Sequence, residues 1–356
     1  MRVTATVTAA ALALGVLMQG AAAETTLRVG FCAKTVSAAA APFAIATKLG
    51  WFAKAGLAVE LVPLPGSSDC VKFVGTGELR YALPSVEPLG QFRPQGITAK
   101  VFYTAYQGFT YGVAVPADSP IKAIGDLKGR TIGVTSIASG GTLVGRALVA
   151  EAGFDPDKDV SIVVAGEGAQ TAALLRTHQV DAVSQFDTQF ALIENAGIPM
   201  RRLPSSSMDH FPANGFIALE ATLAAHRAEA VALAQGYAKG TIFAINNPEA
   251  AVRILWEVYP QTRPTGKDAD TALRDDVKTL EARIANWKLD KGDVTRWGES
   301  NLPHYQAYLD FLLKWGVLKQ GATAEDLVTN ALIDEIDEFD PADTAGAAKA
   351  YRYGPS

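Results

Sequence analysis

Polar side chains gather in four short segments, each of which follows an expected β-strand. The segments are Cys32-Ala33-Lys34-Thr35, Gly66-Ser67-Ser68-Asp69, Ser136-Ile137-Ala138-Ser139-Gly140-Gly141-Thr142 and Gln185-Phe186-Asp187-Thr188. In open parallel sheets, ligands bind in a crevice at the carboxyl ends of the strands. Helices that begin there offer free backbone N–H groups and the positive end of their dipoles, and Ser68 or Asp69 is a suitable N-cap. Capping and turn chemistry explains one such segment, but four together predict a crevice for a small polar molecule.

Sequence signatures of catalysis and of cofactor binding are missing. The stretch 139–145 is rich in glycine but lacks the GK[ST] ending of a phosphate-binding loop, and Gly75-Thr76-Gly77 lacks the third glycine of a dinucleotide fingerprint. No GxSxG, HExxH or CxxC motif occurs. The two cysteines and the four histidines show no zinc-ligand spacing. We therefore expect no enzyme, no resident cofactor and no metal.

Strands and helices alternate through the first two thirds of the chain. The expected strands are 27–31, 59–62, 81–83, 99–103, 112–115, 131–135, 160–164, 180–183 and 217–219. The expected helices between them are 38–49, 70–79, 141–151, 169–177 and 188–195. Such alternation is typical of βαβ units and a parallel sheet. Longer helices are expected over 223–245, 248–258, 269–287 and 303–315, so the pattern predicts two similar α/β halves and a helical C-terminal third.

Length and charge narrow the class of protein. The chain has 356 residues, of which 49% are hydrophobic, so it has enough apolar sequence for a sizeable core and the length of about two domains. Lys and Arg total 32 against 37 Asp and Glu, which gives a net charge of −5. A mildly acidic chain without a basic patch has no general attraction to nucleic acid or to an anionic membrane surface. We therefore expect no nucleic-acid partner.

Residues 1–23 have the pattern of a secretory signal peptide. Arg2 supplies the positive charge, residues 9–18 form an apolar run too short to span a membrane, and Ala21-Ala22-Ala23 fit a cleavage site. Cleavage after Ala23 would leave 333 residues (356 minus 23). We expect an exported, soluble protein.

Export changes the interpretation of the two cysteines, because an oxidising compartment permits disulfides. Cys32 follows the first expected strand and Cys70 follows the second. If these strands are parallel neighbours, a Cys32–Cys70 disulfide is geometrically plausible. The alternative of two buried free thiols stays open.

Six segments together resemble one family, the periplasmic substrate-binding proteins of ABC importers in the thiamine-pyrimidine, alkanesulfonate, taurine and nitrate group. They are 26–31 (TLRVGF), 46–61 (ATKLGWFAKAGLAVEL), 124–134 (IGDLKGRTIGV), 179–183 (QVDAV), 247–251 (NPEAA) and 326–330 (DLVTN). Each motif alone is moderately specific, whereas their order and spacing identify the resemblance.

The resemblance implies an α/β, two-lobe periplasmic-binding-protein clamshell of type II with two hinge strands and a helical C-terminal region. Lobe 1 would comprise residues 24–110 and 215–356, lobe 2 residues 111–214, and the crossing strands would lie near 106–113 and 214–217. The family binds a small-molecule ligand by hinge closure. It works in the periplasm as a monomer, without a cofactor, and delivers ligand to an inner-membrane permease driven by a cytoplasmic ATPase.

The family's pocket loops and hinge point to a set of candidate ligand-binding residues. Gln185-Phe186-Asp187 stands where relatives often carry a W-E-P run, so Asp187 replaces a glutamate. The candidates are Phe31, Lys34, Ser67, Ser68, Asp69, Ser85, Glu87, Tyr106, Ser136, Ser139, Gly140, Thr142, Phe186, Asp187 and Asn214.

Charge within this set bears on the ligand. Asp69, Glu87 and Asp187 outnumber Lys34, the one evident base, and such a site favours hydrogen-bond donors over a naked anion. This predicts an amino-heteroaromatic ligand such as a thiamine-type pyrimidine. The alternative is a sulfonate, nitrate or small carboxylate at the helix start 139–142. Two other roles stay open. One is a partner of a membrane sensor kinase. The other is a pyrimidine-synthase-like enzyme, although the cysteine-rich motif and the reactive histidine of that family are not evident in this sequence.

Overall fold

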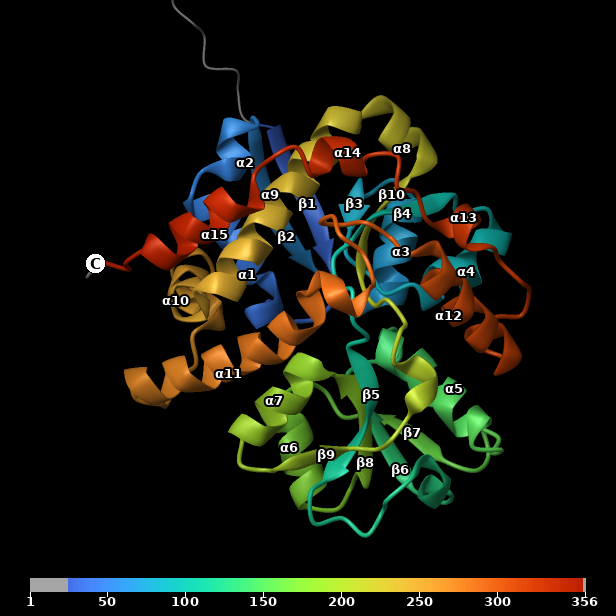
Figure 1. The fold of residues 1–356 in the computed structure, drawn as a ribbon. Coiled ribbons are helices and arrows are strands. Elements are labelled where there is room, and N and C mark those ends of the chain that lie inside the picture. The colour runs from blue at the N-terminus through green and yellow to red at the C-terminus, as the bar shows by residue number, and fades with distance from the viewer. Residues whose placement is uncertain (1–24, 355–356) are drawn as a thin grey trace, which may run out of the picture.

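Two five-stranded sheets organise the computed structural model, which describes residues 25–354 (Figure 1). The first sheet has the order β2-β1-β3-β10-β4. Its strands are β1 (Thr25–Phe31), β2 (Leu57–Pro63), β3 (Tyr81–Ala82), β4 (Ala99–Thr104) and β10 (Gly215–Leu219). The second sheet has the order β7-β6-β8-β5-β9. Its strands are β5 (Tyr111–Pro116), β6 (Thr131–Val134), β7 (Ser161–Val164), β8 (Ala182–Phe186) and β9 (Met200–Arg202). We call the parts around these sheets lobe 1 and lobe 2.

Both sheets are mixed: the expected parallel pairing holds between β1, β2 and β3 and between β6, β7 and β8, but not for the remaining strands. In lobe 1, β10 runs antiparallel to β3 and β4, and in lobe 2, β5 runs antiparallel to β8 and β9. The reason is the path of the chain. β5 and β10 are each the first strand after the chain crosses between lobes, so each starts at the sheet edge where its neighbours end.

Helices cover both sheets. Before the second crossing they are α1 (Ala41–Lys48), α2 (Trp51–Lys54), α3 (Ser67–Gly75), α4 (Glu87–Phe92), α5 (Gly140–Glu151), α6 (Ala169–Arg176) and α7 (Asp187–Asn195). The C-terminal helices are α8 (Glu220–Ala225), α9 (Arg227–Asn246), α10 (Pro248–Val258), α11 (Ala269–Trp287), α12 (Leu302–Lys314), α13 (Ala324–Leu327), α14 (Ile333–Ile336) and α15 (Pro341–Ala350). They surround lobe 1, and α11 reaches along the cleft to pack on α7 of lobe 2 (Figure 1).

Several expected element ends differ from the structure. The helix expected over 223–245 is divided into α8 and α9 at His226. The strand expected over 180–183 starts at Ala182 and continues through Phe186, so Gln185 and Phe186 belong to a strand and Asp187 opens the helix. The helix expected from Cys70 begins at Ser67. Its N-cap is Gly66, so the expected cap at Ser68 or Asp69 is wrong, because both residues lie inside the first turn.

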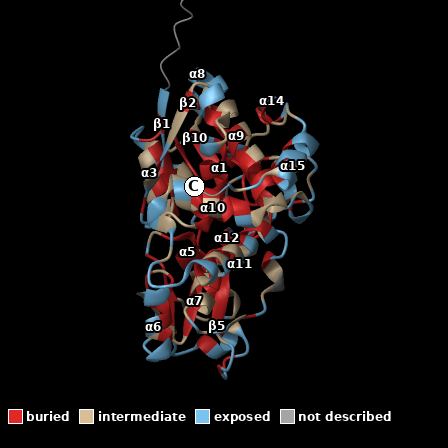
Figure 2. Ribbon diagram, turned by 90° about the vertical axis from the view of Figure 1, so that its left-hand side faces the viewer, coloured by how far each residue is buried: buried red, intermediate tan, exposed pale blue. Residues whose placement is uncertain are grey.

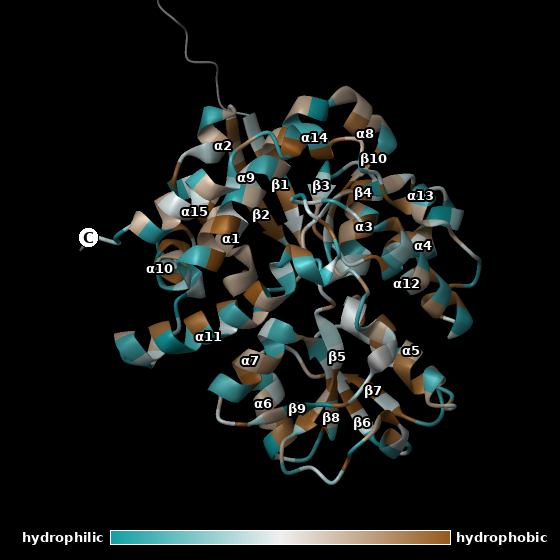
Figure 3. Ribbon diagram, viewed as in Figure 1, coloured by the Kyte–Doolittle hydropathy of each residue, from teal (hydrophilic) through white to brown (hydrophobic). Residues whose placement is uncertain are grey.

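The core of lobe 1 is an aromatic cluster that joins its sheet to α1 and α9. Phe43, Phe102, Tyr103, Phe216 and Tyr237 are at most 1% exposed, and their contacting rings have centroids 4.9 to 6.1 Å apart. Buried residues fill the interior of both lobes (Figure 2), and hydrophilic residues concentrate on outer helix faces such as that of α11 (Figure 3). Within residues 25–354, no helix combines the length and apolar character that a bilayer crossing requires. The expected signal peptide lies outside the described residues.

The chain crosses between the lobes through two irregular segments, 105–110 and 203–214, each of which ends where β5 or β10 begins. The two segments are bonded to each other. The backbone N–H groups of Ala105 and Tyr106 both donate to the Asn214 carbonyl at 3.0 Å, and the Ala213 N–H donates to the Tyr106 carbonyl at 3.0 Å. Tyr106 and Asn214 therefore stand where the two crossing segments are bonded together.

A disulfide joins the end of β1 to α3. β1 and β2 are parallel neighbours, with Phe31 opposite Pro63, so the segments that follow them emerge side by side. Cys32 comes directly after β1 and Cys70 lies in α3, with their Cα atoms 5.9 Å apart and their sulfurs bonded. The bridge fixes two of the polar segments that follow strands of lobe 1.

Replacing the bridge by Cys32→Ala/Cys70→Ala should lower the free energy of unfolding by about 2–4 kcal/mol, because the cross-link restricts the unfolded chain. The separation of 38 residues places the expected loss in that range. Urea unfolding of both proteins measures the loss. Alkylation of the unreduced, denatured wild type, followed by mass spectrometry, should find no free thiol. Two labelled cysteines would contradict the pairing.

Candidate functional site

A narrow pocket lies where the two lobes meet the crossing segments. Its walls come from the turn after β1, from residues near Leu83 after β3, from both crossing segments, from the end of β8 and from α11. The lining residues are Phe31, Cys32, Ala33, Ser37, Ala39, Leu83, Tyr106, Thr110, Tyr111, Phe186, Asn214 and Arg283. Four of the candidates from the sequence are among them: Phe31, Tyr106, Phe186 and Asn214.

Arg283 forms a buried ion pair across the cleft with Asp187. Arg283 belongs to α11 of lobe 1, and Asp187 is the first residue of α7 in lobe 2. Arg283 Nη2 lies 2.6 Å and Arg283 Nε lies 3.1 Å from Asp187 Oδ1. The other carboxylate oxygen, Asp187 Oδ2, accepts a hydrogen bond from Asn286 Nδ2 at 2.8 Å. Both charged side chains are at most 5% exposed. Burial lowers the pKa of Arg283, but the Asp187 carboxylate outweighs it and holds that pKa above its ordinary value.

Aromatic rings surround this guanidinium. Its central carbon lies 4.1 Å from the ring centre of Tyr106 and 5.9 Å from that of Phe186. Tyr111 meets Phe186 edge to face, with centroids 5.9 Å apart. A cation over ring faces is stabilised by the ring quadrupole, more strongly where water is excluded. The pocket therefore combines flat apolar faces with one cation that already has an anionic partner.

The neutral polar side chains of the pocket differ in whether they have hydrogen-bond partners. Asn214 Nδ2 donates to the Leu83 carbonyl at 2.9 Å, and its Oδ1 accepts from the Tyr111 hydroxyl at 3.3 Å. The Thr110 hydroxyl is buried and has no hydrogen-bond partner among the described residues. A buried unpaired hydroxyl is costly, so Thr110 is a natural contact for a polar atom of a ligand.

Glu87 is fully buried behind the pocket, at the start of α4. Its Oε1 accepts a hydrogen bond from the Tyr308 hydroxyl. Burial raises the pKa of Glu87 above its ordinary value of 4.5, against the opposing effect of that hydrogen bond. The environment thus favours the neutral acid.

The start of α5 is packed directly against lobe 1. Ser139 is the N-cap and accepts from the Gly141 N–H at 3.2 Å. A Cβ added at Gly140 would lie only 2.4 Å from Ser85 Oγ and 3.0 Å from the Tyr111 hydroxyl oxygen, so only glycine fits there. The Ser136 hydroxyl donates to the Pro65 carbonyl at 2.7 Å, across the cleft.

The other candidates lie around the pocket without lining it. Lys34 is exposed, and its backbone N–H donates to Glu167 at 3.3 Å. Ser67 Oγ accepts from the Ser85 N–H at 3.0 Å. The Ser68 N–H donates to the Ala138 carbonyl at 3.1 Å, and the Thr142 hydroxyl donates to the Ser136 carbonyl at 2.7 Å. Asp69 is half-buried in α3, 3.8 Å from Lys72.

The charges of the pocket differ from those expected. The sequence suggested three carboxylates and one base, Lys34. In the structure Asp187 is neutralised by Arg283, burial favours the neutral form of Glu87, and Lys34 is exposed and does not line the pocket. Sequence reasoning missed Arg283 and Thr110. Thr110 adjoins the aromatic run at the first crossing, which was a usable signal, whereas Arg283 sits in a helix without a local motif.

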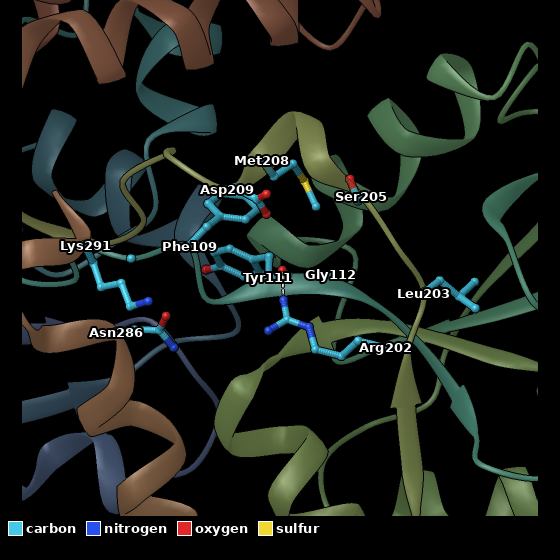
Figure 4. A pocket seen from close by; sticks show the side chains of 11 residues that line it. Phe109, Tyr111, Gly112, Arg202, Leu203, Ser205, Met208, Asp209, Asn286 and Lys291 are labelled. Atoms are coloured by element: carbon cyan, nitrogen blue, oxygen red, sulfur yellow. Dashed lines mark hydrogen bonds between the residues drawn. The ribbon is translucent and has the colours of Figure 1, made fainter. Parts of the chain in front are cut away.

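A second pocket opens beside the crossing segments and shares Tyr111 with the first (Figure 4). The Arg202 guanidinium donates to the Tyr111 carbonyl there, and Lys291 and Asn286 approach from the C-terminal part of lobe 1. Residues of both crossing segments line this pocket, among them Phe109 and Met208.

Replacing Arg283 by methionine should lower the free energy of unfolding by about 3–5 kcal/mol, because Asp187 would be left buried without its cation. Lys278→Met is the matched control. Lys278 pairs with Glu194 at 2.7 Å between the same two helices, but the side chains are 53% and 30% exposed. Such a pair contributes at most about 1 kcal/mol. Urea unfolding compares the two losses, and equal losses would contradict a special role for the buried pair.

Glu87 should make stability depend on pH. Its folded pKa is raised, so its stabilising contribution is complete below its ordinary pKa of 4.5 and is lost as the pH rises through the folded pKa. The free energy of unfolding of the wild type should therefore fall relative to that of Glu87→Gln as the pH rises above 4.5. Asp276, whose pKa burial raises to about 6, affects both proteins alike. If the difference in free energy of unfolding between the wild type and Glu87→Gln does not change as the pH rises, the pKa of Glu87 is not raised.

Comparison with known proteins places this architecture in a family. The chain is 22% identical to the riboflavin-binding protein RibY of Chloroflexus aurantiacus over 226 residues, which are 63% of this chain and 64% of that protein, so the match spans less than two thirds of the relative. The alkanesulfonate-binding protein SsuA of Xanthomonas axonopodis pv. citri, bound to MOPS, aligns with a TM-score of 0.64 at 15% identity over 87% of this chain and 99% of that one. The nitrate-binding protein NrtA of Synechocystis PCC 6803 aligns with a TM-score of 0.61 at 17% identity, over 92% of this chain and 99% of that one.

These structural likenesses confirm the two-lobe α/β fold of periplasmic binding proteins. A family model described as NMT1/THI5 like matches residues 37–251, which is more than half of the 356 residues. The chain therefore belongs to the NMT1/THI5-like family.

Proposed function

We propose that this protein is an extracytoplasmic solute-binding protein of an ABC importer, which captures a small flat heteroaromatic molecule between its lobes. The interlobe pocket supports this proposal most directly, because it places aromatic rings of the first crossing segment and of lobe 2 around one buried guanidinium of lobe 1. A site built from two lobes and two bonded crossings suits capture by closure. The captured ligand passes to an inner-membrane permease driven by a cytoplasmic ATPase.

The chemistry of the pocket favours a neutral ring over a cation. Asp187 is satisfied by Arg283 and Asn286, and burial favours the neutral acid at Glu87, so neither offers a free negative charge to an amine. Tyr106, Phe186 and Tyr111 offer ring faces and edges, and Thr110 offers an unpaired hydroxyl. A pyrimidine, with polar atoms at its edge, matches this set of groups, and the cavity of about 40 Å³ would have to widen by movement of the lobes to admit it. A relative named for riboflavin binding supports the same class.

A sulfonate, nitrate or small carboxylate at the start of α5 is the second candidate. The Ser85 hydroxyl is buried there without a partner among the described residues. It lies next to the capped N-terminus of α5, a helix of twelve residues. Relatives of the same fold are named for alkanesulfonate and nitrate. The close packing of Gly140 on Ser85 and Tyr111 leaves this position no space without movement of the lobes. The aromatic pocket comes first because it already holds a small cavity lined by ring faces, which movement of the lobes would enlarge.

Binding accounts for the site better than catalysis does. The lining cysteine, Cys32, is held in a disulfide, and the buried carboxylate Asp187 is committed to Arg283. Among the described residues that line the pocket there is no histidine to serve as a base. We accordingly prefer a binding protein that acts as a monomer in the periplasm over a pyrimidine-synthase-like enzyme.

Thermal unfolding of the refolded, ligand-free protein tests the function. The panel comprises a thiamine-type pyrimidine, riboflavin, an alkanesulfonate, taurine, nitrate and a benzoate. A ligand at 100 times its Kd adds about 2.7 kcal/mol of stability. A heteroaromatic should raise the Tm and the anions should not. Stabilisation by an anion alone would move the site to the start of α5. If no compound of the panel raises the Tm, the proposed ligand classes are wrong.

Phe186→Ala should weaken the heteroaromatic hit at least about tenfold, since stacking of a ring on an aromatic side chain contributes about 1–3 kcal/mol. Phe154→Ala is the matched control, because Phe154 is also half-buried in lobe 2 but packs beside Lys128 away from the pocket. Titration calorimetry of both variants gives the two affinities. Equal affinities would exclude Phe186 from the site.

A further inference from the structure

Two histidines and an aspartate from distant parts of the sequence meet on the surface beside the second crossing segment. The ligating atoms of His210, Asp293 and His304 all lie within 4.8 Å of one another. His304 Nε2 is 3.5 Å from the Asp293 carboxylate, and the two imidazole rings have centroids 5.6 Å apart. None of these residues takes part in the interlobe pocket.

The side chain of Asn301 holds two of the three in place. Asn301 is the N-cap of α12, and its Oδ1 accepts from the backbone N–H of His304 at 3.3 Å. Its Nδ2 donates to the Gly292 carbonyl at 2.9 Å, so the same residue anchors the turn that carries Asp293. Asp293 has φ of +52°, a conformation that Asp and Asn tolerate better than most residues.

His210 is held from the other side by its neighbour. Phe211 is buried against Tyr308 and Phe311 of α12, with centroids 4.6 and 5.4 Å away. The anchored Phe211 thus keeps the imidazole of His210 beside the first turn of α12. The cluster is therefore positioned by packing and capping rather than by chance contact of free loops.

We propose that His210, Asp293 and His304 form a binding site for a divalent transition-metal ion, with Zn²⁺ as the representative. Two imidazoles and one carboxylate are a donor set that such ions accept, with a further position left for water or an external ligand. Bonds of about 2.1 Å put tetrahedral donors about 3.4 Å apart. His210 and Asp293 are exposed and His304 is half-buried, so small side-chain rotations close the difference.

Such an ion would tie the second crossing segment to lobe 1. His210 lies within the crossing segment 203–214, whereas Asp293 and His304 lie in the C-terminal part of lobe 1. The segment joins the lobes, so a bound ion restrains the part of the chain that must bend when the lobes move. The site is separate from the proposed ligand pocket and stands whether or not the ligand assignment holds.

The test is titration calorimetry of Zn²⁺ into the tag-free protein after removal of metal with a chelator. We expect one ion per chain in the wild type, with a rise in Tm that the chelator reverses. His210→Ala and Asp293→Asn should each weaken binding at least tenfold, and asparagine keeps the backbone conformation at position 293 accessible. His178→Asn is the control, since His178 also has positive φ (+54°) but lies in lobe 2.

Two results would overturn the proposal. One is a wild type that takes up no stoichiometric zinc, and the other is affinity that stays unchanged in both His210→Ala and Asp293→Asn. Loss of binding in His178→Asn alone would assign the ion to another site and would equally overturn it. Thermal unfolding without metal shows that each variant is folded as the wild type is.

Discussion

The ion pair between Arg283 and Asp187 is the constraint on which the meeting of the two lobes depends. Each charge is almost completely removed from water, and each would be very unfavourable there without the other. The two residues come from different lobes, so the pair fixes how α7 approaches α11. Tyr106 and Phe186 then pack around the guanidinium and become walls of the pocket.

The same pair determines the charge that the pocket presents. A free Asp187 would attract an amine and a free Arg283 would attract an anion, whereas the pair presents neither charge alone. Burial favours the neutral acid at Glu87, and so removes a second of the three carboxylate charges that the sequence suggested. What remains is ring faces, one unpaired hydroxyl at Thr110 and the edge of a guanidinium. The Cys32–Cys70 disulfide fixes the part of the pocket wall at the end of β1.

Local patterns in the sequence were enough for the order of strands and helices and for the neighbourhood of the pocket. The parallel pairing of β1 and β2 was foreseeable from their hydrophobic runs, and it brings Cys32 close to Cys70. The mixed sheets were not foreseeable in this way, because the direction of β5 and β10 follows from the path of the crossings and not from their composition. The extension of β8 to Phe186 was missed for a related reason: pairing with β5 prolongs the strand beyond its apolar run.

Contacts between segments that lie far apart in the chain could not be predicted from the sequence. Arg283 lies in a helix whose sequence gives no sign that one arginine turns toward the cleft, and its partner is in the other lobe. The meeting of His210 with Asp293 and His304 likewise arises from the packing of Phe211 on α12. Side chains such as Glu87 and Asp187 were recognised as close to the site, but their charge state depends on burial and on partners far along the chain.

Small-angle X-ray scattering of the ligand-free protein tests most directly whether the buried pair holds the lobes together over the pocket. The wild type and Arg283→Met are measured at the same concentration, with Lys278→Met as the control. The account predicts a larger radius of gyration for Arg283→Met alone, with the wild type and the control matching the arrangement in which α11 packs on α7. Identical scattering from the wild type and a folded Arg283→Met would contradict it.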